Sequence, residues 1–341
     1  MKWLPLVLAT VPLLSHSSVF NSVHGCNIRE DSDMWALYKQ QFVTSDGRVV
    51  DNSNNSISHS ESQGYGMVMA TFFHDHASFR AIWRWTQQTL QRDSDQLFSW
   101  KWQSATPHIP DRNNASDGDI FIAWALLKAE EVWPGNRYRE QAAAIINALA
   151  DTHLVTLDKH TALLPAGYGF EHPSSTVVNP SYWVYPAFND FAKFNARWQS
   201  LNDGGMKILE KSQFGQHALP SDWIEYRNNQ WEPAQQFPPR FSYASYRIPL
   251  YLIWGGYDNA INDHYRSWLK KYNRAWVDVE TNTMANYRAP SGANAIAALV
   301  QLSNEDYKHR SVLPEPTLSD DYYSASLIIF SHIAFYERYC Q

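Results

Sequence analysis

The sequence predicts an all-α fold, in which about eleven helices form a toroid or a solenoid-like domain. Two observations predict it. Apolar residues recur at three- and four-residue spacing in many segments of roughly 10–18 residues, separated by loops rich in Pro, Gly and Asn. Strand-like runs are short and do not alternate regularly with helices, as an α/β fold requires.

The apolar spacing places each helix in turn. The clearest is Asp321–Arg338, which carries Leu327, Ile328, Phe330 and Ile333. His153–Leu157 and Thr161–Leu164 read as a small hairpin, and Gly204-Gly205 reads as a turn. The expected helices span about 33–42, 62–73, 77–91, 118–132, 137–150, 184–200, 203–213, 240–254, 260–271, 291–302 and 321–338.

Composition narrows the class of protein. The chain has 341 residues, of which 44% are hydrophobic and 18% charged, and no Pro/Gly/Ser linker divides it, so we expect one folded domain. A net charge of -6 argues against a nucleic-acid partner, which normally meets a basic surface. Aromatic residues make up 15% of the chain, including 15 Trp, and flat rings along a groove would suit stacking on sugars. Trp100 and Trp102 lie in a polar, loop-like stretch and are the expected stacking residues.

The N-terminus reads as an export signal. Lys2 precedes a short apolar run, Trp3–Leu14, which is followed by small and polar residues. We therefore expect residues 1–25 to be a signal peptide, residues 26–341 to be the mature domain, and the protein to be secreted or periplasmic. No run is long enough to span a membrane. Cys26 and Cys340, the two cysteines, would form a disulfide in an oxidising compartment, although a lipidated Cys26 is the alternative.

A first segment with chemical potential is Ser60-Glu61-Ser62-Gln63-Gly64-Tyr65-Gly66-Met67. Ser60 and Gln63 fit a helix-capping box, which is a purely structural interpretation. Glycines in the first two helical turns cost about 1 kcal/mol each relative to Ala and indicate a close approach to the backbone. A carboxylate beside such a surface, Glu61, could be a general acid.

A second segment runs from Ala115 to Trp133. Ser116 and Asp119 again fit a capping box, and carboxylates suit the first turn of a helix. Asp117 and Asp119 could also present carboxylates to a cleft. Two helix starts that each offer a carboxylate are what glycoside hydrolysis requires.

Both segments resemble glycoside hydrolase family 8, which contains bacterial endoglucanases, chitosanases, lichenases and xylanases. Ala115–Trp133 is similar to the family signature, and Ser60–Met67 resembles its acid-bearing motif. Asn179–Tyr182, Pro220–Trp223 and Tyr243–Arg247 resemble segments of the periplasmic cellulases of cellulose-synthesis operons. The resemblance covers about residues 26–341. It implies an (α/α)6 barrel and inverting hydrolysis of β-1,4 links in glucan chains.

The resemblance also implies roles for individual residues. Glu61 becomes the general acid, with a pKa raised by aromatic walls such as Tyr65, and Asp117 becomes a second catalytic carboxylate. Asp119 is expected to contact the sugar at the cleavage point. The further substrate-binding residues implied or expected are Tyr65, Trp100, Trp102, Tyr182, Trp223 and Arg247. No cofactor and no metal are expected, His74-Asp75-His76 reads as a solvated loop, and we expect a monomer.

The sequence departs from the family pattern at one position. Where the family commonly has the general base, in a Tyr-Asp-x-x-Arg segment, this chain has Ala244. Alanine cannot accept a proton. The base could come from elsewhere, with Asp119, Asp222, Glu225 and Asp320 as candidates, or the change could be an engineered one. Alternatively the protein binds glucan with weakened catalysis, or the same chemistry acts on chitosan or xylan.

Overall fold

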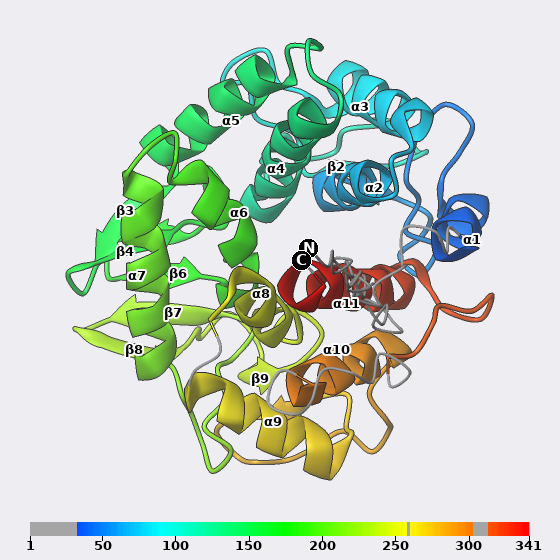
Figure 1. Ribbon diagram of the computed structural model, residues 1–341. Helices are drawn as coiled ribbons and strands as arrows, with labels where there is room; N and C mark the ends of the chain where they lie inside the picture. Colours follow the sequence, from blue (N-terminus) through cyan, green and yellow to red (C-terminus); the bar gives the residue numbers. More distant parts are fainter. Residues whose placement is uncertain (1–32, 258–259, 303–312, 341) are drawn as a thin grey trace, which may run out of the picture.

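The helices form two concentric rings in the computed structural model, which describes residues 33–257, 260–302 and 313–340 (Figure 1). In this part of the chain the helices are α1 (Asp33–Phe42), α2 (Ser60–Phe72), α3 (His76–Leu90), α4 (Ser116–Val132), α5 (Tyr138–Thr152), α6 (Tyr185–Phe191), α7 (Arg197–Lys211), α8 (Arg247–Gly255), α9 (Ala260–Tyr272), α10 (Ser291–Leu302) and α11 (Tyr322–Tyr339), with a 3-10 turn η1 (Pro180–Tyr182). The predicted all-α fold is confirmed.

The inner ring consists of α2, α4, α6, α8, α10 and α11. Each of these helices contacts the next, and α11 meets α2 again, so the ring closes. The outer helices α1, α3, α5, α7 and α9 each pack against an inner one. Burial follows the layers. Inner α4 is buried on all sides from Ser116 to Leu127, whereas outer α3 buries a stripe that includes Phe79, Ile82 and Thr86.

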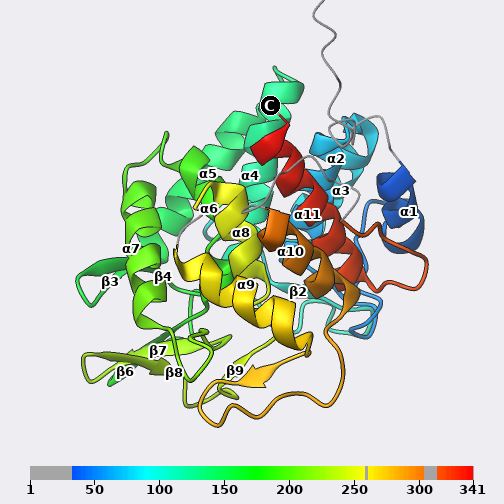
Figure 2. The same ribbon diagram turned by 60° about the horizontal axis from the view of Figure 1, so that its bottom comes forward.

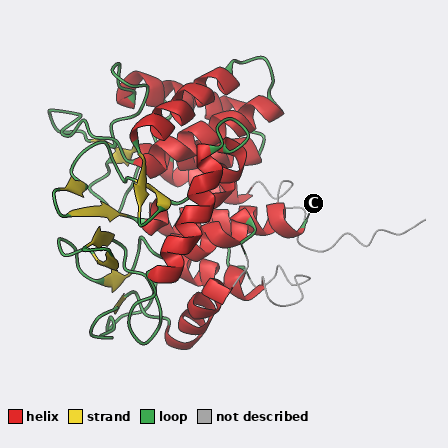
Figure 3. Cartoon of the chain, turned by 90° about the vertical axis from the view of Figure 1, so that its left-hand side faces the viewer, coloured by secondary structure: helices red, strands yellow, loops and turns green. Residues whose placement is uncertain are grey.

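Short strands gather at one end of the helical ring, and the C-terminal end of α11 lies at the other (Figures 2 and 3). They pair antiparallel: β1 (Ser58–His59) with β2 (Lys101–Trp102), β3 (Leu154–Leu157) with β4 (His160–Leu163), β9 (Arg240–Phe241) with β10 (Val277–Asp278), and β5 (Glu171–His172), β6 (Ser175–Val178), β7 (Ile224–Arg227) and β8 (Gln230–Pro233) in one sheet. The β3–β4 hairpin confirms the predicted one.

The turn expected at Gly204-Gly205 is wrong. Both glycines lie inside α7, which begins only after a break that divides the single helix expected over 184–200. They serve packing rather than chain reversal. A Cβ on Gly204 would lie 2.2 Å from the carbonyl oxygen of Thr161, because β4 crosses α7 at this point.

Two helix starts also differ from expectation. His59, not Ser60, is the N-cap of α2, and it forms a capping box with Ser62 rather than Gln63. Ala115 precedes α4 without a side-chain cap, so the Ser116–Asp119 box is absent. Gln63 instead accepts from the Val49 amide at 2.6 Å, inside the core.

The helix expected over 240–254 starts later, at Arg247. The Asp222 carboxylate accepts hydrogen bonds from the amides of Ser242 (2.9 Å) and Ser245 (3.0 Å), and so holds residues 243–246 as turns. Ala244 therefore lies in the turn before α8 rather than on the helix.

None of the helices in the described ranges is long and apolar enough to cross a membrane. The predicted signal peptide, residues 1–25, and Cys26 lie outside the described residues. The signal peptide and the disulfide to Cys340 therefore stay predictions.

Candidate active site

The predicted catalytic residues meet at the strand-bearing end of the inner ring. Glu61 stands in the first turn of α2, Asp117 in the first turn of α4, and Arg247 opens α8. Ser181 of η1 completes the group, because its hydroxyl accepts a hydrogen bond from Arg247 at 2.9 Å. Three segments far apart in the sequence thus converge on the guanidinium that α8 supplies.

Arg247 binds both carboxylates through a single nitrogen. Its Nη1 lies 3.1 Å from Oε2 of Glu61 and 3.2 Å from Oδ2 of Asp117. Oxygens this close to one atom are nearer to each other than the roughly 6.5–9.5 Å that separates an inverting acid–base pair. This close pairing does not fit Asp117 as the base that holds a water opposite Glu61.

The surroundings shift the pKa values of the two carboxyl groups in opposite directions. Burial and the neighbouring charge of Glu61 together raise the pKa of Asp117 to about 7, against the opposing effect of Arg247. The expected rise for Glu61 is wrong: burial favours a raised pKa, but the charge of Arg247 is the main effect that opposes burial, and the pKa of Glu61 is lowered.

Tyr65 lies beneath the pair and is fully buried. Its hydroxyl is 3.0 Å from that of Tyr251 and accepts from Arg247 at 3.3 Å. The structure thus places Tyr65 as a support for Arg247 rather than on the substrate surface. Burial and the nearby Glu61 charge raise its pKa well above the usual range, so the hydroxyl stays protonated.

Glycines explain how α2 and α4 approach so closely. A Cβ on Gly118 would lie 2.1 Å from Oγ of Ser60, and one on Gly64 would lie 2.5 Å from Cβ of Phe121. The close backbone approach inferred from the glycines is confirmed, and the approaching partner is the neighbouring helix.

A cavity of about 280 Å³ is connected to this cluster through Tyr182, which lines the cavity and whose ring centre lies 5.6 Å from the Arg247 guanidinium. Aromatic rings and amide side chains share its wall, which suits a sugar ring with apolar faces and hydroxyl edges. Its lining residues are Trp100, Asp111, Asn113, Asn114, Ala115, Pro165, Ala166, Phe170 and Tyr182. Two of the expected substrate-binding residues, Trp100 and Tyr182, line this cavity, and their binding of substrate stays a prediction.

The Asp111 carboxylate fixes the Trp100 ring. It accepts from Nε1 of Trp100 at 2.9 Å and from the hydroxyl of Tyr168, whose side chain is exposed. These hydrogen bonds hold the pKa of Asp111 below its usual value, even though desolvation acts in the opposite direction. Sequence reasoning missed Asp111 and Tyr168, because their spacing carries no motif.

Trp102 and Trp223 contact protein groups instead. His108 stacks on the Trp102 ring, and the Arg48 guanidinium lies 4.8 Å from its centre. Trp223 is stacked between Phe170 and Phe237, with ring centres 5.4 and 4.5 Å away. Trp223 thus supports Phe170, a cavity residue that sequence reasoning missed.

Asp119 is fully buried and does not line the cavity. Its oxygens accept from the Phe98 amide at 2.9 Å and from the Asn114 side chain at 2.7 Å. Burial raises the pKa of Asp119 to about 8. Asn114 connects Asp119 to the cavity wall, and its side chain also reaches Nε2 of His153 at 2.8 Å.

The four candidate bases differ in their surroundings. Asp119 is buried, as described above. Glu225 pairs with Arg227 at 2.9 Å in the β5–β8 sheet, and Asp320 binds Ser291 at the start of α10. Asp222 alone of the four binds the turn that contains Ala244. Burial raises the pKa of Asp222, against the hydrogen bonds from Ser242 and Ser245.

His74-Asp75-His76 is a structured connection rather than a solvated loop. Asp75 caps α3 by accepting from the Ser78 amide at 3.0 Å and pairs with Lys39 at 2.7 Å. His76 stacks on Trp133. Within the described ranges, no cluster of His, Cys, Asp and Glu is arranged to hold a metal ion.

Comparisons with known proteins identify the family of the chain. Residues 7–336 match the family model described as glycosyl hydrolases family 8. An endoglucanase of Cellulomonas uda is 36% identical over 273 residues, 78% of this chain and 76% of that protein. A probable endoglucanase of Novacetimonas hansenii is 34% identical over 313 residues, 89% of this chain and 90% of that protein.

Solved structures agree as well. Endoglucanase Cel10 of Klebsiella pneumoniae, a family 8 glycosyl hydrolase, superposes with a TM-score of 0.84 at 35% identity, covering 89% of this chain and 98% of that one. The chain belongs to glycosyl hydrolase family 8, and its two-layered helical ring is the (α/α)6 barrel of that family. The family resemblance of the sequence is confirmed.

Proposed function

We propose that the protein is an endo-β-1,4-glucanase that cleaves internal bonds of cellulose-like chains with inversion. The single observation that supports it most is the Glu61–Arg247–Asp117 cluster at one end of the barrel, next to a cavity with aromatic walls. Similarity to endoglucanases over most of the chain supports the substrate class.

In this proposal Glu61 protonates the leaving glycosidic oxygen. The raised pKa of Asp117 suits it to share a proton with Glu61, and a sugar that displaces Arg247 from Glu61 would let that proton pass to Glu61. Trp100, Phe170 and Tyr182 hold the neighbouring sugars. Asp222 is the proposed water-activating carboxylate, since it binds the turn in which the family's usual base position is Ala244.

A single assay tests the function. Reducing ends released from carboxymethylcellulose, barley glucan, xylan and chitosan are measured together, and the anomer first formed is followed by proton NMR. Release from the two glucans as α-anomer supports the proposal. Release only from xylan or chitosan would show that one of these polymers, not glucan, is the substrate. Binding without release would identify a glucan-binding protein.

We also propose export to the periplasm or medium, with residues 1–25 removed, and action as a monomer in cellulose trimming. The short apolar run after Lys2 supports export. N-terminal sequencing of the exported protein and light scattering test these two points, and an acyl chain on Cys26 would contradict soluble release.

A further inference from the structure

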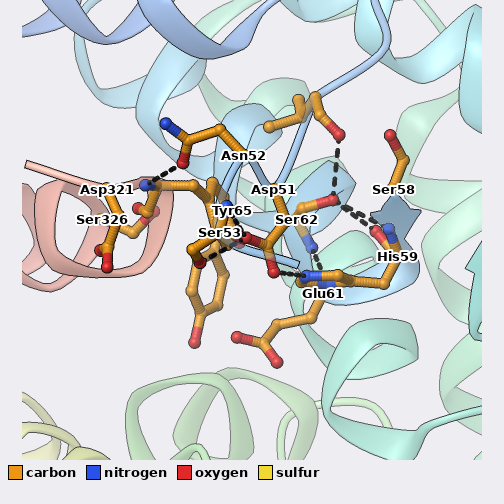
Figure 4. A network of polar contacts seen from close by, with 12 residues as sticks. Asp51, Asn52, Ser53, Ser58, His59, Glu61, Ser62, Tyr65, Asp321 and Ser326 are labelled. Carbon is orange, nitrogen blue, oxygen red and sulfur yellow. Dashed lines mark hydrogen bonds and ion pairs between the residues drawn. The ribbon is translucent and has the colours of Figure 1, made fainter. Parts of the chain in front are cut away.

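His59 links the general-acid helix to the preceding loop (Figure 4). Its Nδ1 accepts a hydrogen bond from the Ser62 amide at 3.0 Å, which caps α2 two residues before Glu61. Its Nε2 lies 3.5 Å from Oδ2 of Asp51, which is itself held by the amide and hydroxyl of Ser53. One ring therefore bridges the helix start and a buried carboxylate.

This arrangement exceeds what a cap needs. A serine or asparagine at the N-cap satisfies the same amide with a smaller side chain. The His59 ring additionally packs edge-on against Tyr322, with ring centres 5.5 Å apart. Asn52, next to Asp51, accepts from the Tyr322 amide at 3.0 Å, so the same loop also holds the start of α11.

The donor and acceptor roles are fixed by the partners. Because the Ser62 amide donates to Nδ1, that nitrogen carries no proton in this geometry, and the ring proton belongs on Nε2, facing Asp51. This is the pattern in which a carboxylate holds an imidazole in one tautomer and orientation. Here the imidazole in turn fixes the helix that carries the acid.

We propose that His59, oriented by Asp51, is a positioning residue that aims Glu61 at the glycosidic oxygen. The inference rests on the proposed hydrolysis and adds to it a residue that does not touch substrate. Glu61 must leave Arg247 and reach a sugar oxygen without movement of its backbone, and the Asp51–His59 bridge holds that backbone.

The test separates capping from positioning. His59→Ala removes both, whereas His59→Ser restores an N-cap but reaches neither Asp51 nor Tyr322. We expect His59→Ser to recover most of the Tm lost in His59→Ala, while kcat stays about tenfold or more below the parent and KM changes less than about twofold. Parental kcat in His59→Ser would overturn the proposal, since a simple cap would then suffice.

Two further variants test whether Asp51 is needed to orient His59. Asp51→Ala should lower kcat like His59→Ser, and Asp51→Asn, whose amide oxygen still accepts from Nε2, should recover much of it. The matched control is Asp75→Ala, which removes the N-cap of outer helix α3 and should lower Tm with kcat unchanged. A loss of kcat in Asp75→Ala equal to that in His59→Ser would show that cap loss anywhere has the same effect.

A measurement without turnover distinguishes failure of this inference from failure of the proposed function. ¹⁵N NMR of the histidine rings should show His59 protonated on Nε2 alone, and ¹³C NMR should show the Glu61 carboxyl titration shifted by about 0.5 unit or more in His59→Ser. A proton on Nδ1, or an unshifted Glu61, overturns the inference even if the parent hydrolyses glucan. A parent without hydrolysis but with both signals overturns only the function.

Discussion

The hydroxyl of Tyr323 donates a 2.6 Å hydrogen bond to the carbonyl oxygen of Tyr243. This bond ties the first turn of α11 to the turn that contains Ala244, and Asp222 binds the same turn from the other side. The family's usual base position is therefore held in a defined place, although its side chain is a methyl group.

Ala244→Asp tests whether the protein already has a base: with Asp222 as the water-activating carboxylate kcat should not rise, whereas with no such carboxylate it should rise by about 10²-fold or more. The turn is already fixed, and Arg247, whose amide binds the Ala244 carbonyl at 3.1 Å, would favour the ionised form. Steady-state rates on barley glucan measure this. A lower rate, with parental activity measurable, would mean that another carboxylate already serves.

Asp222→Asn gives the complementary result. If Asp222 is the base, kcat falls by about 10²-fold or more in the parent. Asp222 also organises the turn. The Tm of Asp222→Asn must therefore be compared with the Tm of Ser242→Ala, which removes one hydrogen bond to the same carboxylate. Equal kcat losses in Asp222→Asn and Ser242→Ala would indicate a structural role alone.

Glu61→Gln should reduce hydrolysis by about 10²–10⁴-fold with the fold intact, because the amide still accepts from Arg247 but donates no acid proton. Reducing-end release and circular dichroism test it. Glu140→Gln, at an exposed glutamate on outer helix α5, is the matched control. A Glu61→Gln variant with more than half the parental rate would remove Glu61 from the mechanism.

Trp100→Ala should weaken binding of long cello-oligosaccharides by roughly 1–3 kcal/mol, or about 5- to 150-fold, while short ones that do not reach the cavity bind unchanged. Asp111→Ala should do the same to a smaller extent, since the ring loses its Nε1 acceptor. Titration calorimetry with ligands of increasing length shows the difference. The exposed Asp93→Asn is the control, and a length-independent loss in Trp100→Ala would contradict the assignment.

His153 predicts the acid limit of stability. Burial, helped by the charge of Arg92, lowers its pKa to about 4, against about 6.5 in an unfolded chain. The unfolded state therefore binds the extra proton first as pH falls, and unfolding free energy decreases between about pH 6.5 and 4, by roughly 3 kcal/mol from this residue. His153→Gln, whose amide oxygen still accepts from Asn114, should flatten this slope in urea titrations. An unchanged slope would refute the prediction.

Much of the fold was predictable because apolar periodicity reports burial directly. The bounds expected for α1 and α10 agree with the structure. Gly204 was not predictable as a helix residue, since the partner that requires it, Thr161, lies on another element. Likewise the Asp222 carboxylate determines where α8 starts, and no local pattern near Arg247 reports that.

The candidate site likewise has a part that the sequence predicts and a part that it does not. Residues within the Ser60–Met67 and Ala115–Trp133 segments could be located by resemblance, and Glu61 and Asp117 meet as expected. The residues that support the site could not be located in this way. Asp111 and Phe170 acquire their positions from loops that come together only in three dimensions, and the low pKa of Glu61 depends on Arg247, which is 186 positions away in the sequence.

The contact between Gly118 and Ser60 has a consequence for how this enzyme can change. With no room for even a methyl group between the two helix starts, Glu61 and Asp117 behave as one rigid unit. Substitutions that alter the spacing of one carboxylate necessarily displace the other. Variation in substrate choice is therefore left to the cavity loops, and variation in water activation to the turn at Ala244, both of which can change without moving the acid.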